Sequence, residues 1–155
     1  MKKVLIGIAI FILIVVIVVI LLLKNKKEEV VIEPVEKELP DTIKIIVNET
    51  ELIVNLEDNR TKKALLEKLD EGDIIINAQD YSNFEKVGDL GFSLPRSDKY
   101  TKTEPGDVIL YNGNQIVLFY GTNTWNYTRI GKINITGEEL ESILGEGDVT
   151  YTITK

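Results

Sequence analysis

The sequence predicts a mainly β protein, namely a closed antiparallel β-barrel with two capping α-helices, preceded by an N-terminal transmembrane helix. Short β-branched runs separated by turn signals indicate seven or eight strands. Only two segments in the soluble part have helical spacing, and they lie far apart in the chain. Closure into a barrel is favoured because it leaves no exposed sheet edge.

The N-terminal feature is an unbroken apolar run over residues 4–23, after a short flank of residues 1–3. As a helix it would span roughly 30 Å, the hydrocarbon thickness of a bilayer. The run is longer than the apolar region of a cleaved signal peptide, and no small-residue cleavage site follows it. We therefore predict an uncleaved single-pass anchor, with late cleavage as the alternative.

The sidedness of this anchor is less strongly coded, because Lys residues flank the apolar run at both ends. The very short N-terminal flank resembles that of signal anchors, and a chain without Cys is compatible with export. We expect a cell-membrane protein with an extracytoplasmic C-terminal domain. Residues 24–40 are charged and contain Pro34 and Pro40, which predicts a tether, and residues 41–155 form the folded domain.

The first half of this domain begins with a predicted hairpin and helix. Two β-branched runs, Thr42–Val47 and Glu51–Glu57, form the hairpin, and Thr61–Leu69 has the apolar stripe of a helix, with Asp58, Asn59 or Thr61 as its cap. A strand, a bent strand or ordered loop, and a polar loop follow, at Asp73–Ala78, Glu85–Pro95 and Arg96–Glu104.

The second half contains the clearest hairpin in the chain. Asp107–Tyr111 and Gln115–Tyr120 are joined through Asn112-Gly113, which supplies the positive φ angles of a type I′ turn. A short strand follows at Arg129–Ile133. Thr136 and Glu139 have the spacing of a capping box, so a second helix begins there and ends at Gly145. Asp148–Thr154 alternates as a final strand.

Composition excludes several function classes. The net charge of −7 makes nucleic acid a poor partner. With no His and no Cys, the chain lacks Ser-His-Asp and Cys-His catalysis, zinc-finger-like sites and thiol redox chemistry. It also has no Gly-rich phosphate loop, and Asp70, Glu71 and Asp73 lack the spacing of a calcium loop. We expect neither a metal nor a cofactor.

Several consecutive motifs resemble the prokaryotic cyclophilin-like fold family, a remote relative of the cyclophilin peptidyl-prolyl isomerases. They cover nearly everything from Thr42 to Ile153 and include segments 56–59, 64–66, 85–95, 105–107, 113–121 and 127–133. The resemblance implies an eight-stranded barrel with two capping helices.

The resemblance also assigns positions in a groove. Gln115 is similar to the groove glutamine of cyclophilins, and Trp125 lies about where their groove tryptophan falls. Cyclophilins carry a catalytic arginine on the third strand, but the corresponding run 73–81 holds no Arg and no His, and Tyr127 stands at the groove histidine position. The resemblance therefore implies the fold more than the isomerase activity.

The candidates for a ligand groove share either an aromatic or a donor side chain near these motifs. They are Gln115, Phe119, Trp125, Tyr127, Arg129 and Arg96. Arg129 or Arg96 would have to replace the missing catalytic arginine, and each has the alternative of being an ordinary surface residue. Trp125 either stacks on a ligand or covers the barrel end, and Gln115 either binds a peptide backbone or points to water.

We expect a membrane-anchored, non-catalytic module that binds a peptide or small ligand. The first alternative is a peptidyl-prolyl cis-trans isomerase acting on exported proteins, by preorganised donors that stabilise the twisted amide. The second is an assembly protein whose anchor or tether binds another membrane protein.

Overall fold

The computed structural model describes residues 2–24 and 39–155, which belong to two compact units divided after Lys37. The first unit contains helix α1 (Lys2–Lys24), in which the side chains of residues 2–5, 7, 9 and 10 are outside the described set. Within the described part of the chain, no helix is both long and apolar enough to cross a membrane. The predicted membrane span over residues 4–23 is not supported by this finding. Residues 25–38 of the predicted tether lie outside the described residues.

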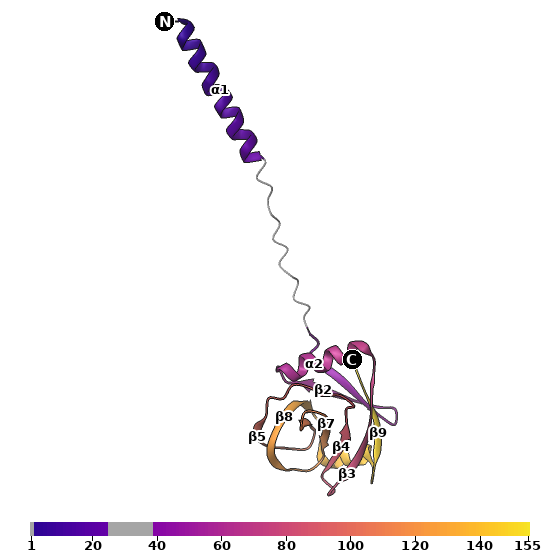
Figure 1. Cartoon of the computed structure of the whole chain (residues 1–155). Helices are drawn as coiled ribbons and strands as arrows, with labels where there is room; N and C mark the ends of the chain where they lie inside the picture. Colours follow the sequence, from indigo (N-terminus) through magenta and orange to yellow (C-terminus); the bar gives the residue numbers. More distant parts are fainter. Residues whose placement is uncertain (1, 25–38) are drawn as a thin grey trace. The chain divides into compact units, whose positions relative to one another are not determined.

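The second unit contains nine strands and two helices, coloured in chain order in Figure 1. The strands are β1 (Thr42–Val47), β2 (Thr50–Leu56), β3 (Ile74–Tyr81), β4 (Glu85–Asp89), β5 (Lys99–Lys102), β6 (Asp107–Tyr111), β7 (Gln115–Phe119), β8 (Thr124–Ile133) and β9 (Val149–Thr154). The helices are α2 (Arg60–Glu71) and α3 (Gly137–Leu144).

Eight of these strands close into an antiparallel barrel. The order is β2-β1-β9-β3-β4-β7-β6-β8, and β8 pairs back to β2 through Leu56↔Gly131, Asn55↔Lys132 and Val54↔Ile133. β5 pairs only with the first half of β8. The predicted closed barrel with two capping helices is confirmed for the domain.

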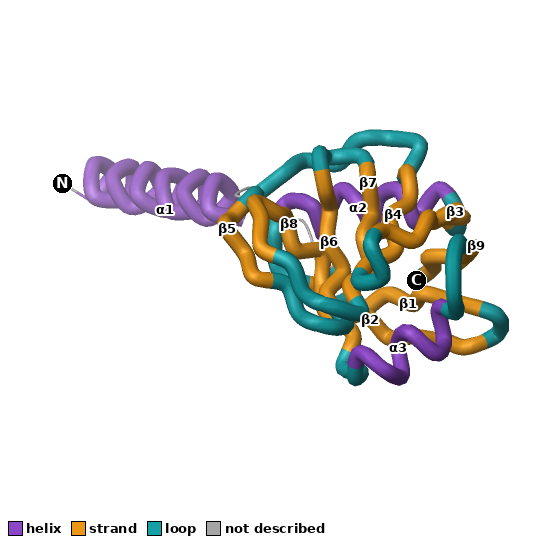
Figure 2. Tube along the Cα trace, turned by 90° about the horizontal axis from the view of Figure 1, so that it is seen from below, coloured by secondary structure: helices purple, strands orange, loops and turns teal. Residues whose placement is uncertain are grey.

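The barrel interior holds the main hydrophobic core. Alternate residues of the strands point inward, as the period of two requires; Ile43, Ile45, Ile76, Leu110 and Ile153 are almost completely buried. Helix α2 lies at the top of the barrel in Figure 1, and α3 lies at the lower edge of the domain in the view of Figure 2. Their buried leucines join the same core: Leu65, Leu66, Leu69, Leu140 and Leu144.

Local signals account for the helix ends and the turns. The Asn59 side chain accepts hydrogen bonds from the first amides of α2, and Thr136 and Glu139 form the complete capping box of α3. Asn112 and Gly113 have φ angles of 51° and 85°, as a type I′ hairpin requires. The first hairpin turns on Asn48 and Glu49, so Thr50 already belongs to β2.

One loop prediction was wrong, and one predicted strand was too short. The polar loop predicted over Arg96–Glu104 contains strand β5, and the short strand predicted at Arg129–Ile133 is the second half of the ten-residue β8. The register of β8 shifts opposite Val108 and Ile109, a bulge-type irregularity. After the shift, Arg129 and Thr128 still pair with Ile109 and Leu110 of β6, and only residues 124–127 of β8 pair with β5 instead.

Candidate functional site

The outer face of strands β3, β4, β7 and β6 forms the floor of the candidate site. Side chains that point out of the barrel lie in cross-strand rows, because paired residues share a face. One row runs Tyr81–Glu85–Phe119, and the next runs Gln79–Val87–Val117–Ile109. A third row contains Asp89, Gln115 and Tyr111.

A second hydrophobic cluster lies on this floor, outside the barrel core. It consists of Ile109, Val117, Phe119 and Tyr127, with Phe84, Val87 and Tyr111 packed against it. The Tyr127 ring, which comes from β8, packs edge-on against Phe119 and Tyr111, with centroids 5.6 and 5.9 Å apart. These contacts hold the first half of β8 against the floor.

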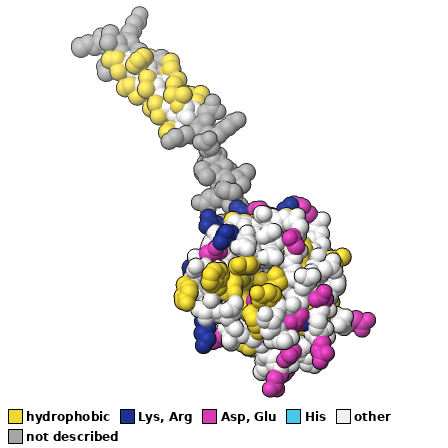
Figure 3. Space-filling model, turned by 60° about the horizontal axis from the view of Figure 1, so that its bottom comes forward, with side chains coloured by type: hydrophobic (Ala, Val, Ile, Leu, Met, Phe, Trp, Pro, Cys, Tyr) yellow, Lys and Arg dark blue, Asp and Glu magenta, His cyan; other side chains and the backbone are white. Residues whose placement is uncertain are grey.

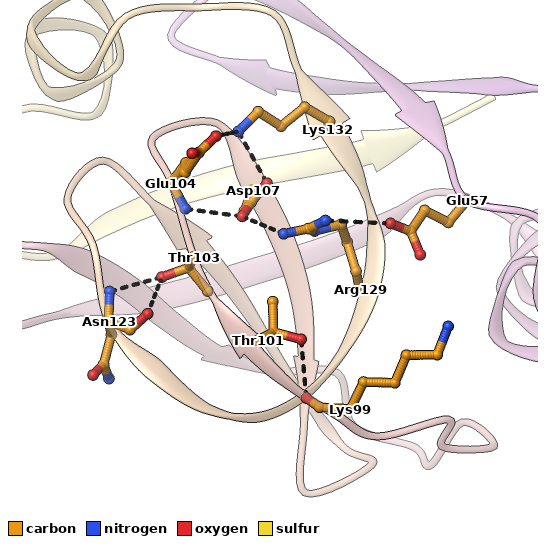
Figure 4. Close-up of polar contacts among 9 residues, drawn as sticks. All are labelled: Glu57, Lys99, Thr101, Thr103, Glu104, Asp107, Asn123, Arg129 and Lys132. Atoms are coloured by element: carbon orange, nitrogen blue, oxygen red, sulfur yellow. Dashed lines mark hydrogen bonds and ion pairs between the residues drawn. The ribbon is translucent and has the colours of Figure 1, made fainter.

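Hydrogen bonds hold the chain just before β8 in the same place. The Asn123 backbone amide donates to the Thr103 hydroxyl at 2.8 Å, and that hydroxyl donates to the Asn123 carbonyl at 3.1 Å (Figure 4). The Asn123 side-chain amide donates to the Tyr127 hydroxyl at 3.0 Å. Burial, with the nearby Glu85 carboxyl as a second cause, raises the pKa of Tyr127 to about 12. The Tyr127 side chain is therefore uncharged at neutral pH, and its hydroxyl is a hydrogen-bonding group at the cavity.

A cavity of about 870 Å³ lies between the floor and this part of β8. Its volume falls in the usual range of small-molecule sites. The aromatic residues of its lining are Tyr81, Tyr111, Trp125 and Tyr127. The charged lining residues are all acidic: Asp80, Glu85, Asp89 and Asp148. Figure 3 shows hydrophobic side chains gathered on one face of the domain, with acidic side chains beside them.

Glu85 has an unusual environment among these carboxylates. Only 8% of the residue is exposed, and Oε2 is buried without a hydrogen-bond partner. Its neighbours across the ladder are Tyr81 and Phe119, which offer no cation. Burial raises the pKa of Glu85 to about 7, since desolvation disfavours the ionised form.

Asp80, by contrast, is fully paired. Its Oδ2 accepts from the Lys86 ammonium and from the Tyr120 hydroxyl, both at 2.6 Å. The bond from Lys86 is the main cause that lowers the pKa of Asp80. The Lys86 ammonium, which is almost completely buried, also donates to the carbonyls of Gly145 and Gly147 just after α3. This network supports the cavity from beneath.

The structure brings three of the predicted groove residues to the cavity: Gln115, Trp125 and Tyr127. Trp125 lies on β8 and is 56% exposed. Phe119 lies under the cavity, in the second cluster, and is fully buried. Its chain neighbour Tyr120 points the other way and joins the barrel core.

The two predicted arginines lie elsewhere. Arg129 pairs with Asp107 at 2.9 Å and approaches Glu57 at 3.5 Å, while Lys132 pairs with Asp107 from the other side at 3.0 Å (Figure 4). Arg96 pairs with Asp98 in the loop before β5. Within residues 39–155, neither arginine lines the cavity, nor does any lysine. Neither Arg129 nor Arg96 is therefore positioned to take the place of the missing catalytic arginine in this cavity.

Sequence reasoning missed Glu85, Tyr111 and the acidic rim. A signal for Glu85 was present: it begins a run with Lys86 in which consecutive residues point to opposite faces, so one charge must face the barrel interior and the other the outer face. For a metal, the donor set is poor. In the described ranges no three His, Cys, Asp or Glu side chains are grouped so as to hold an ion.

Comparisons with known proteins identify the family to which the chain belongs. The sequence matches the Cyclophilin-like family over residues 45–154, and the chain belongs to that family. A hypothetical protein of Archaeoglobus fulgidus, whose structure was determined in solution, has a similar fold, with a TM-score of 0.57 and 18% sequence identity. The match covers 77% of this chain and 97% of the archaeal one. No curated protein matches the sequence.

Proposed function

We propose that the domain is a non-catalytic module that binds a peptide or small ligand in the cavity between β8 and the outer face of the barrel. One observation carries the proposal: a cavity of ligand size combines aromatic walls with a lining in which residues 39–155 place no Arg or Lys. Isomerisation of a prolyl bond requires a donor aimed at the twisted amide. The lining offers aromatic and amide contacts for binding but no cationic donor for that step.

Selection of random peptides on the full-length protein in neutral detergent micelles tests this proposal. We expect the enriched peptides to bind the wild type and the Tyr100→Ala control, and to lose affinity for Trp125→Ala. Tyr100 is a suitable control because it is an exposed aromatic residue on the neighbouring strand β5 and does not line the cavity. Peptides that bind all three proteins equally would place recognition outside the cavity.

The alternative, a peptidyl-prolyl isomerase, is tested in the same preparation. Exchange spectroscopy on an Ala-Pro peptide is expected to give no accelerated cis–trans exchange at catalytic protein concentrations. Accelerated exchange that Trp125→Ala abolishes would replace the binding-module proposal with an enzyme whose donor is not an arginine.

We further propose that α1 anchors the domain to the cell membrane, with the domain outside the cytoplasm. The support is the apolar sequence of residues 4–23 and the exposure of Phe11–Leu23, each residue of which is at least 44% exposed. Charged groups at a bilayer centre are costly. The double variant Ile14→Lys/Val18→Lys should therefore be released from membranes by alkaline extraction, whereas Ile14→Leu/Val18→Leu should remain. Protease digestion of intact spheroplasts then reports the sidedness.

A further inference from the structure

The electrostatics of the cavity point to the charge of its ligand, an inference that rests on the binding function proposed above. Four carboxylates line the cavity, and the described domain contributes no cation to the lining. An acidic surface alone does not make a site, since carboxylates are common throughout this chain. Only a carboxylate that lacks a partner within the fold is available to pair with a charged ligand.

Three of the four have a hydrogen-bonding role within the fold. Asp80 accepts from Lys86 and Tyr120. Asp89 accepts from the Gly91 amide at 2.6 Å, and Asp148 accepts from the Asp80 amide at 3.3 Å. These contacts satisfy one oxygen or more of each side chain and tie neighbouring loops to the sheet.

Glu85 is the exception. It is more than nine-tenths buried and lines the cavity, and its Oε2 has no hydrogen-bond partner. A buried carboxylate without a partner is unfavourable, and a cation that pairs with it removes that cost. The cavity therefore contains a specific point at which a positive charge is stabilised.

The surroundings of Glu85 fit an organic cation. Tyr81 flanks it on β3, and Tyr127 lies close enough for the Glu85 charge to affect its hydroxyl. Aromatic faces attract ammonium and guanidinium groups, most strongly where water is excluded. A hard metal ion needs several oxygen ligands, and the described residues provide no group of three suitable donors. The site offers one anchoring carboxylate and aromatic walls instead.

We infer that the cavity binds an ammonium or guanidinium group, which pairs with the Glu85 carboxylate and packs against the aromatic wall formed by Tyr81, Trp125 and Tyr127. The group can be carried by a basic residue of a peptide or by a free organic amine. Trp125 lines the cavity and is the single tryptophan of the chain, so its fluorescence is a direct reporter of occupancy.

The test uses the full chain in neutral detergent micelles at pH 8. The probes are N-acetylated, C-amidated tripeptides with a central lysine, arginine, glutamine or glutamate, and n-butylammonium as the free amine. Binding is followed by Trp125 fluorescence and, for all variants, by calorimetry. The variants are Glu85→Gln, Trp125→Ala and the control Glu67→Gln, which removes the same charge from an exposed position on α2, away from the cavity.

We expect the lysine or arginine peptide to bind at least about tenfold more tightly than the glutamine peptide. Glu85→Gln should remove that preference, and Glu67→Gln should change affinity by less than about twofold. If n-butylammonium binds as tightly as the basic peptides, the ligand is a free amine; if only the peptides bind, it is a basic segment. Both results support the inference.

Equal binding of the glutamine and lysine peptides, or unchanged affinity in a folded Glu85→Gln variant, would overturn the inference. Glutamine is nearly isosteric with glutamate, so the variant is expected to fold, and circular dichroism is the measurement that checks it. If peptides bind without regard to charge but lose affinity for Trp125→Ala, the inferred preference for a cation is wrong, while the proposal of a binding module is supported. If the selected peptides do not depend on Trp125 either, the proposed function fails as well.

Discussion

Glu85 and Lys86 are adjacent on β4, yet only Lys86 has a charged partner. The Lys86 ammonium lies 2.6 Å from Asp80 and donates to two carbonyls after α3. Glu85 points to the other face of the strand and lines the cavity, with its Oε2 buried and unpartnered. The alternation of a strand separates the two charges and prevents them from neutralising each other. One charge is therefore structural, and the other is available to a ligand.

Replacing Lys86 by methionine should destabilise the domain by about 3–5 kcal/mol, because it leaves a partly buried carboxylate and two carbonyls without their donor. Urea denaturation followed by circular dichroism measures the free energy of unfolding. The control Lys63→Met, at an exposed position of α2, should change it by no more than about 0.5 kcal/mol. Equal effects of the two substitutions would mean that the Lys86 network contributes nothing specific.

Replacing Glu85 by glutamine should stabilise the ligand-free domain at pH 8 and leave it nearly unchanged at pH 4. The pKa of Glu85 is raised from 4.5 to about 7 by burial, so the folded state favours the protonated form. The favourable contribution of the raised Glu85 pKa to the free energy of unfolding is fully present below pH 4.5, and it is lost as the pH rises through 7. The gain at pH 8 has an upper limit of about 3 kcal/mol, reduced by whatever water reaches the carboxyl.

Unfolding curves at pH 4, 6 and 8 for the wild type and Glu85→Gln check this sign. Tyr127, which lines the cavity near Glu85, has a raised pKa of about 12 and stays neutral in this range, and the paired Asp80 is common to both proteins. A stability difference that shrinks as the pH rises would contradict an unpaired Glu85.

Replacing Arg129 by glutamine should lower stability by about 1–3 kcal/mol without affecting ligand binding. Arg129 is the partner of Asp107, whose side chain is only 1% exposed, and it does not line the cavity. Denaturation and the peptide-binding assay together separate the two roles. Arg96→Ala, which removes an exposed ion pair, should cost less than about 1 kcal/mol. A loss of ligand binding in a folded Arg129→Gln variant would mean that Arg129 does contribute to the binding site.

Gly131→Ala should destabilise the domain by about 3 kcal/mol or more, because it obstructs barrel closure. A Cβ atom at Gly131 would lie 2.4 Å from the Asn55 carbonyl oxygen and 2.8 Å from Val54, on the strand that pairs with β8 to complete the ring. Thermal unfolding and amide exchange at β2 measure the effect. Wild-type protection of the β2 amides in this variant would mean that the barrel accommodates the added Cβ atom without separating β2 from β8.

The sequence predicted the barrel well where its local signals were strong. The Asn112-Gly113 turn, the capping box at Thr136 and the alternation of β9 correspond to elements of the structure. It failed at β5 and at the first half of β8. Those residues are mostly polar and exposed on both faces, so no alternation marks them, and their pairing with each other is a long-range contact.

The site was only partly predictable for the same reason. Gln115, Trp125 and Tyr127 were reached through the resemblance to cyclophilins, and all three line the cavity. Arg129 was a plausible donor because it follows aromatic residues in the sequence. Its actual partner, Asp107, is 22 positions away and is brought near by the pairing of β6 with β8. Local sequence does not show which distant carboxylate neutralises an arginine.

The position of β9 in the ring also sets the order of events during synthesis. β9 fills the place between β1, which is made early, and β3. Until the ribosome has released Val149–Thr154, both neighbours present open edges with unpaired amides and carbonyls, and such edges readily recruit other chains. Shortening the chain before Val149 would therefore leave β1 and β3 with open edges and an incomplete ring, not a smaller closed barrel.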